Sequence, residues 1–355
     1  MLRDAFPSAG LGDDTAVFER EAGETLFASD AVVEGVHFRK EYSSPGQAVQ
    51  KAISSCVSDV YAMGGTPERI LVTAGLPEGL DEGAVTGIVA GIAAACAVYG
   101  IRLAGGDTVF SPGGTFFDIS IIGRSGSGGA VLRSGAAAGD LVFVTEECGL
   151  SLAGLRLLGM LFDGAGAEDP LSALLPASKE ERNAIVSVIG SLSLLTTAEG
   201  ISALCRKKGL GAPAALALRM IRQQIVPRAN EFPRLGRGDG VTAMIDVSDG
   251  ISRDLSTLCE ESSVGALLKE EDLPVPGALR ELPGAAPDYL AGLALESGEE
   301  YCRIFTARGG GSKIPEGAAI RVGEITPSGG ALLRSRDGKT RSLGGGGYEH
   351  FFGRR

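Results

Sequence analysis

Acidic residues beside glycine or serine recur in five clusters along this chain, and they are the residues best suited to chemistry. The clusters are Gly12-Asp13-Asp14, Ser29-Asp30, Ser58-Asp59, Gly105-Gly106-Asp107 and, more than a hundred residues later, Asp246-Val247-Ser248-Asp249-Gly250. Mg2+ prefers hard oxygen ligands of this kind and commonly joins them to the phosphates of a substrate. The pattern therefore predicts an oxygen-lined site for several Mg2+ ions. Any one of these aspartates taken alone is more typical of a solvated surface group or a helix cap.

Short strands and helices must position these clusters. Residues 25–28 read as a strand with the second cluster at its end, and residues 101–104 as a strand that runs into the fourth cluster. From residue 47 to 63 the apolar positions fall at helical spacing, which leaves Asp59 on the flank of the apolar stripe. Further elements are predicted at residues 69–74, 81–99 and 117–124. This mixed order of strands and helices is typical of an α/β domain.

The second half of the chain reads as a separate domain. A glycine-rich stretch precedes a new strand at residues 141–145, so we expect domains at 1–138 and 139–355. A long helical section at residues 149–225 has an acidic, glycine-rich interruption at 163–170. The fifth cluster closes a strand at residues 241–247 and opens a helix. Ser248 suits the N-cap of that helix, where backbone N–H groups and the helix dipole favour a phosphate.

Composition excludes several classes of protein. A chain of 355 residues with a net charge of −11 lacks the basic character that nucleic acids and anionic membranes recruit. Six cysteines without a CxxC spacing predict neither a zinc site nor a disulfide framework, and most should be small core residues. The most apolar window, residues 87–101, is short for a membrane span, and we interpret it as a buried helix. The first residues have no apolar signal-peptide core, and a cytoplasmic protein is expected.

Familiar nucleotide-binding motifs are missing from the sequence. It contains no G-x-x-x-x-G-K-[ST], no G-x-G-x-x-G between a strand and a helix, and no paired H-R-D and D-F-G. An enzyme that uses ATP would need another way to hold phosphates here. Aspartate clusters that share bridging metals are a reasonable substitute.

Eight ordered segments give the chain a resemblance to a known family. The segments, which span residues 10–351, are GLGDDTAVF, ASDAVVEGVHF, SDVYAMGGTPERILVTAGLP, YGIRLAGGDT, LRSGAAAGDLVFVT, MIDVSDGISRDL, SGEEYCRIFTA and GGYEHF. The whole set resembles the motifs of thiamine-monophosphate kinase, within the superfamily of aminoimidazole ribonucleotide synthetase, selenophosphate synthetase and a hydrogenase maturation protein. Members of that superfamily use ATP without a P-loop.

The resemblance implies a fold and a reaction. The fold is α/β (α+β) with two domains: an N-terminal mixed sheet with helices that binds ATP and Mg2+ and forms a homodimer through its strands, and a C-terminal α/β domain that completes the site. The reaction is direct, in-line transfer of the γ-phosphoryl group of ATP to thiamine monophosphate, giving thiamine diphosphate in the cytoplasm. The acceptor phosphate is already anionic, so no residue is expected to act as a general base.

The resemblance also implies roles for individual residues. It gives the metal ligands as Asp14, Ser29, Asp30, Asp59, Asp107, Asp246 and Asp249, with Asp13 as the alternative to Asp14. The implied ATP contacts are Tyr99, Gly106, Asp107, Arg133 and Ser248, and the implied substrate contacts are His37, Glu299 and Tyr348. Each aromatic residue has a plainer alternative, since either tyrosine could be a packing residue.

Three departures from the family pattern affect these expectations. Ala28 stands where a hydroxyl residue often helps to hold one metal, so we expect that ion to bind either more weakly or through the backbone of a neighbouring residue. Gly298-Glu299-Glu300-Tyr301 replaces the usual Gly-Glu-Asp-Tyr, a change that should keep the substrate contact at Glu299. The segment before Gly12 is shorter than usual, so either the start is misplaced or one flap is reduced.

Two alternative functions remain at this point: a sister ATP-dependent enzyme of the superfamily, or a silent nucleotide-binding protein. A selenophosphate synthetase should carry a reactive cysteine in a glycine-rich N-terminal segment, whereas the first cysteine here is Cys56, inside a predicted helix. The presence of every main acidic cluster argues against the silent protein.

Overall fold

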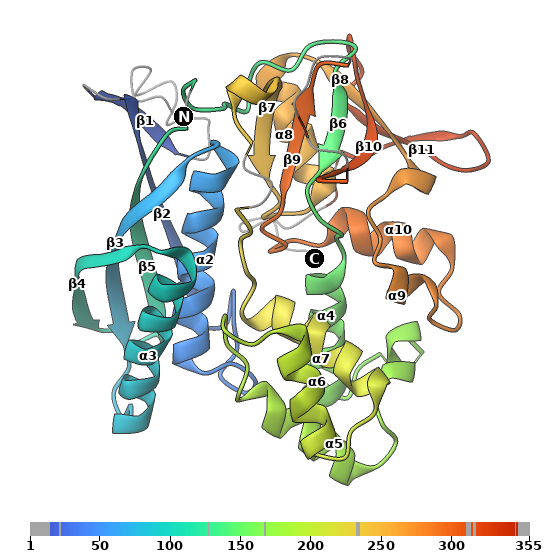
Figure 1. Cartoon of the computed structure of the whole chain (residues 1–355). Helices are drawn as coiled ribbons and strands as arrows, with labels where there is room; N and C mark the ends of the chain where they lie inside the picture. Colours follow the sequence, from blue (N-terminus) through green and yellow to red (C-terminus); the bar gives the residue numbers. More distant parts are fainter. Residues whose placement is uncertain are drawn as a thin grey trace.

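The structure is a computed structural model that describes residues 15–20, 23–126, 128–166, 168–231, 235–309, 314, 317–344 and 346. Within these residues the strands form two sheets, one from each half of the chain (Figure 1). The first sheet has the order β1-β2-β5-β3-β4 and mixes antiparallel pairs with one parallel pair, β3 with β4. Its strands are β1 (Ala16–Arg20), β2 (Gly23–Val33), β3 (Thr66–Leu76), β4 (Arg102–Phe110) and β5 (Phe116–Arg124). The expected mixed α/β fold is therefore confirmed.

Helix α2 (Pro45–Ala62) lies between the first sheet and the rest of the molecule (Figure 1). Ser44 begins it with a capping box: its hydroxyl accepts from the N–H of Gln47, and the Gln47 side chain accepts from the N–H of Ser44. Nearly every residue of α2 is buried, because β2 and β5 cover one side and β7 and α7 contact the other. Several of its polar side chains contact the second half of the chain from inside the molecule, namely Gln47, Gln50, Lys51 and Ser58.

The second sheet has the order β12-β11-β8-β10-β6-β9-β7. Its strands are β6 (Leu141–Val144), β7 (Val241–Asp246), β8 (Gly265–Lys269), β9 (Arg303–Ala307), β10 (Ile320–Thr326), β11 (Ala331–Arg334) and β12 (Thr340–Ser342). Figure 1 shows a group of helices below this sheet and others beside it. They are α4 (Leu150–Leu158), α5 (Lys179–Ile189), α6 (Ala198–Lys207), α7 (Ala212–Ile225), α8 (Ile251–Ser262), α9 (Gly277–Arg280) and α10 (Pro287–Glu296).

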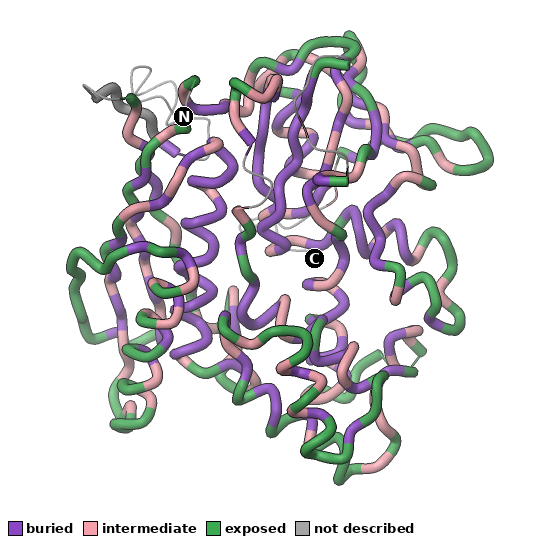
Figure 2. The backbone as a smooth tube through the Cα atoms, in the orientation of Figure 1, coloured by how far each residue is buried: buried purple, intermediate pink, exposed green. Residues whose placement is uncertain are grey.

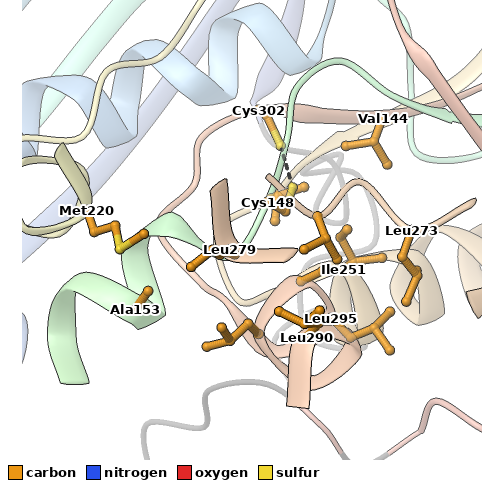
Figure 3. Packing of buried hydrophobic residues seen from close by; sticks show 14 of the residues in the cluster. Val144, Cys148, Ala153, Met220, Ile251, Leu273, Leu279, Leu290, Leu295 and Cys302 are labelled. Carbon is orange, nitrogen blue, oxygen red and sulfur yellow. Dashed lines mark hydrogen bonds between the residues drawn. The ribbon is translucent and has the colours of Figure 1, made fainter. Parts of the chain in front are cut away.

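The largest buried cluster belongs to this second half and joins the sheet to α4, α7, α8 and α10 (Figures 2 and 3). It includes Cys148 and Cys302, whose thiol sulfurs lie 3.4 Å apart (Figure 3). All six cysteines are free thiols, and Cys96 is the only one that is not buried. The prediction that most cysteines are small core residues is confirmed.

Two strands extend further than their apolar residues predict. β2 continues to Val33, so Ser29 and Asp30 lie within the strand and not at its end, and the Gly106 cluster likewise lies inside β4. The expected strand ends were wrong because pairing with neighbouring strands keeps the backbone extended: β5 pairs with β2 as far as Val33, and β3 pairs with β4 as far as Phe110. A Cβ atom at position 106 would lie 2.0 Å from the carbonyl oxygen of Val72, so the close approach of β3 requires glycine there.

Helix α3 (Glu82–Tyr99) corrects another expectation. Its apolar sequence predicts a buried helix, yet only 17% of its residues are buried. One side packs so closely on α2 that a Cβ at Gly91 would lie 2.3 Å from the carbonyl oxygen of Gly46. The other side is open, with Val89 63% exposed, and the neighbouring strand β4 is exposed along its whole length (Figure 2). By length and composition alone α3 could also cross a membrane.

Candidate active site

Two of the predicted metal ligands approach the same point on α2. Asp59 lies on the flank of α2, as its place beside the apolar stripe predicts, and Asp30 lies on β2. Burial raises the pKa of the Cys56 thiol well above its usual value, and the nearby charges of Asp59 and Asp30 raise it further. The charges of the two carboxylates, about thirty residues apart in sequence, thus act on the same buried thiol.

The second sheet brings another carboxylate close to this part of α2. Asp246 ends β7 and is 2% exposed, and its Oδ2 accepts a hydrogen bond of 2.7 Å from the Ser58 hydroxyl of α2. Tyr301 lies among the same charges: burial raises the pKa of its hydroxyl, and Glu299, Asp30 and Asp246 add to that rise. A carboxylate of the second sheet therefore contacts the C-terminal half of α2, and its charge acts on Tyr301 together with that of Asp30 on the first sheet.

The two described substrate candidates are joined by a lysine that the sequence analysis missed. The Val33 N–H donates to His37 Nδ1 at 3.1 Å, so this nitrogen is the unprotonated one. The ammonium of Lys51 donates to the carbonyl oxygen of His37 at 2.8 Å and to Glu299 Oε2 at 2.7 Å. A signal for Lys51 was present, because it is the only charged residue between positions 45 and 58.

The donors suit Mg2+ in kind, although they form no closed cage. Over the described part of the chain, no group of three or more His, Cys, Asp or Glu residues could hold a metal ion by itself. Mg2+ usually keeps several waters and binds through one or two carboxylates together with substrate phosphates. The open set formed by Asp30, Asp59 and Asp246 has the oxygen chemistry for that mode of binding.

The loop before α8 differs from its expected role. The helix is capped by Gly250 and not by Ser248, whose predicted N-cap position was wrong. The buried carboxylate of Asp254 accepts hydrogen bonds from the N–H groups of Ser248, Asp249 and Gly250 at 3.0–3.1 Å. These donors are thus used inside the protein, while Asp249 Oδ2 lies 3.1 Å from Arg253 Nε.

The remaining predicted ATP contacts lie on separate elements. Tyr99 is buried, with its hydroxyl 2.7 Å from the Ser54 hydroxyl and accepting from the Ala229 N–H at 3.2 Å, which favours the packing alternative for this residue. Gly106 and Asp107 lie on the edge strand β4, with β3 and β5 between them and β2.

The backbone at Arg133 accepts from Ser262 at the C-terminal end of α8, the end away from Ser248. Ser29, on β2, is exposed, and its hydroxyl donates to Asp118 Oδ1 at 2.9 Å. Asp13, Asp14 and Tyr348 lie outside the described residues.

Glu300, the departure from the family pattern, is fully inside the second half of the chain. Its Oε1 accepts from the N–H groups of Gly149 and Ser151, at the start of α4, and from the Ser297 hydroxyl at 2.6 Å. Burial raises its pKa to about 7, against the lowering effect of these hydrogen bonds. The larger residue thus serves as a cap for the start of α4.

Glu300 gives the protein a pH-dependent stability. Its pKa is higher in the folded chain than the ordinary value of 4.5, so the folded state holds this proton more tightly and stability falls as pH rises from about 4.5 to about 7. A tenfold change in proton affinity corresponds to about 1.4 kcal/mol, so the loss is on the order of 3 kcal/mol. Glu300→Gln can keep the three hydrogen bonds without ionising. We expect its melting temperature to match wild type at pH 5 and to exceed it by several degrees at pH 8. A variant that is less stable than wild type at pH 8 would contradict this assignment.

Comparisons with known proteins agree with this arrangement. Residues 12–125 match the family described as AIR synthase related protein, N-terminal domain. Thiamine-monophosphate kinase of Bacillus subtilis is 39% identical over 150 residues, which cover 42% of this chain and 46% of that protein. The Aquifex aeolicus enzyme of the same name is 30% identical over 310 residues, covering 86% of this chain and 83% of that protein.

Solved structures extend the likeness to nearly the whole chain. The structure of AaThiL complexed with AMPPCP and TMP has a TM-score of 0.70 and 27% identity, and covers 99% of this chain and 94% of that one. The crystal structure of thiamine monophosphate kinase from Aquifex aeolicus has a TM-score of 0.71, 27% identity and 96% coverage of both chains. HypE complexed with ATP is 18% identical at a TM-score of 0.59 and so shares the fold.

Fold and sequence together place the protein in the AIR synthase-like superfamily. Within that class, the chain belongs to the thiamine-monophosphate kinase family. The resemblance drawn from the eight sequence segments, and the enzyme class of thiamine-phosphate kinase, are confirmed.

Proposed function

We propose that this protein transfers the γ-phosphoryl group of ATP directly to the phosphate of thiamine monophosphate. The observation that carries the proposal is the contact between the two halves of the chain beside α2, in a chain of this family. There Asp246 accepts from Ser58, the neighbour of Asp59, and Glu299 pairs with Lys51. The charges of Asp30 and Asp246 both act on the buried Tyr301. A relative of 27% identity complexed with AMPPCP, an analogue of ATP, and TMP supports both substrates. ATP is thus the proposed co-substrate.

Phosphoryl transfer requires that the two substrates are correctly positioned and that the repulsion between their negative charges is offset. Two anionic groups held about 4 Å apart repel by about 4 kcal/mol per pair of unit charges at an effective dielectric of about 20. Bound Mg2+ would supply the positive charge that offsets this repulsion and the developing charge of the transferred group. Asp30, Asp59 and Asp246 would hold the ions, with Asp107, Asp249, Ser29 and Asp13 or Asp14 as further proposed ligands. His37, Glu299 and Tyr348 would orient the acceptor, and no protein base is needed because its phosphate is already ionised.

We assign the two halves different tasks in this proposal. Residues 1–138 would bind ATP and Mg2+ and form a homodimer, and residues 139–355 would complete the site. The exposed apolar side of α3 and the edge strand β4 support the dimer, because a second copy can cover both with one surface. Gly106 and Asp107 lie on that same strand, so assembly and ATP binding would be linked. A cytoplasmic location remains a prediction.

The deciding experiment is a product assay with the full chain. We expect purified protein with Mg-ATP and thiamine monophosphate to form thiamine diphosphate and one ADP per product, separated by chromatography. Parallel reactions replace thiamine monophosphate with the aminoimidazole precursor or with selenide, or omit Mg2+. ATP consumption with one of those other acceptors and none with thiamine monophosphate would reject the proposed substrate.

A further inference from the structure

Lys51 is a buried cation at the centre of the molecule. Its side chain is 1% exposed, and its ammonium has three acceptors: the carbonyl oxygens of His37 at 2.8 Å and Gln224 at 3.2 Å, and Glu299 Oε2 at 2.7 Å. An ammonium buried without partners is very unfavourable, so a lysine kept in this position has its three donors fully used. Lys51 therefore ties α2 to the turn after β2, to α7 and to the segment before β9.

Glu299 is held mainly through one of its two oxygens. Oε2 accepts from Lys51 and also from the Gln224 amide nitrogen at 2.9 Å, and the Gln224 oxygen in turn accepts from the Ser151 hydroxyl at 2.7 Å. Oε1 accepts no hydrogen bond from any residue that the structure describes. The Glu299 side chain is 23% exposed, in contrast to the buried lysine. One oxygen is thus anchored inside the protein, and the other is left for a partner from outside.

The backbone conformation of Glu299 makes the hydrogen bonds at Oε2 more important. Glu299 has a φ of 57°, in the left-handed region that residues other than glycine seldom adopt. Its N–H donates to the carbonyl oxygen of Ser248 at 2.8 Å, which fixes the turn but not the carboxylate. The direction of the side chain therefore depends on the two donors at Oε2.

We infer that Lys51 is a positioning residue for substrate recognition: it holds Glu299 and the His37 turn together so that the free oxygen of Glu299 can accept an N–H from an aromatic amine of the substrate. This inference rests on the proposed function, which supplies a substrate that has both an amino-pyrimidine and a thiazolium ring. Lys51 itself touches no reacting atom.

The test compares Lys51→Met with Lys339→Met. The control residue also forms an ion pair, with Asp337 at 2.8 Å, but its side chain is 86% exposed. We expect K51M to raise KM for thiamine monophosphate about tenfold or more and to leave KM for ATP within about twofold, because only substrate orientation depends on the anchor. Direct titration of thiamine monophosphate without ATP should show the same loss. K339M should match wild type in both measurements.

A double-mutant cycle separates positioning from general damage. On a Glu299→Gln background, K51M should raise KM by less than about threefold, because its effect passes through the carboxylate. Should K51M fail to fold, Gln224→Met removes the second donor to Oε2 and should still raise KM for thiamine monophosphate selectively. Equal effects of K51M on both backgrounds, or unchanged substrate affinity in K51M and Q224M, would overturn the inference. Failure of wild-type protein to form thiamine diphosphate would instead reject the proposed function.

Discussion

Asp30→Ala is expected to lower kcat by about a thousandfold or more and to leave the melting temperature within about 2 °C of wild type. Loss of a metal ligand removes charge compensation where the phosphoryl group is transferred, and each tenfold loss of rate corresponds to about 1.4 kcal/mol of transition-state stabilisation. The fold should tolerate the change. The Asp30 carboxylate accepts a hydrogen bond from the adjacent Ala31 N–H and makes no core contact through its oxygens in the described structure.

The matched control for this prediction is Asp337→Ala, in an exposed hairpin of the second sheet. Activity and thermal unfolding should be measured on the same preparations of both variants over a range of Mg2+ concentrations. D337A should keep wild-type activity, whereas the loss in D30A should persist at high Mg2+ concentration. If activity and melting temperature fell together in D30A, Asp30 would be a structural residue and its proposed ligand role would be wrong.

Patterns within one segment predicted the structure of that segment well. The spacing of apolar residues gave α2 nearly to its ends and set Asp59 on its flank, because one face of a helix is visible in a few turns of sequence. Strand ends were less predictable. Whether Ser29 and Asp30 end β2 or continue it depends on β5, which lies about ninety residues further along the chain.

Two sets of side-chain contacts could not be predicted from the pattern of apolar and polar residues. Ser248 has the right chemistry for an N-cap, but Asp254 takes the N–H groups of the whole loop. Lys51 was missed for a similar reason, since its acceptors come from three separate segments. In both cases a charged side chain is buried, Asp254 in the first and Lys51 in the second, and only the folded chain reveals that burial.

The exposed apolar surface of α3 and β4 leads to the second large prediction, which concerns assembly. We expect the wild-type protein to have twice the mass of the 36.3 kDa chain by light scattering. Phe110→Asp should convert it to a monomer at the same concentration, because Phe110 ends β4 and is 66% exposed in the single chain. A charge there meets water in the monomer but would be buried in a dimer, at a cost of several kcal/mol.

Leu195→Asp is the matched control for assembly, because Leu195 is 62% exposed and lies outside α3 and β4. It should remain a dimer with full activity. The monomeric F110D protein should lose phosphoryl transfer, since Gly106 and Asp107 lie on the strand that would no longer be supported by a partner. A monomeric wild type, or a dimer that persists in F110D, would show that another surface or another partner covers α3. If F110D were monomeric but active, the wild-type dimer would still stand as predicted, but ATP binding would not depend on it. Asp107 would then not be needed at the site.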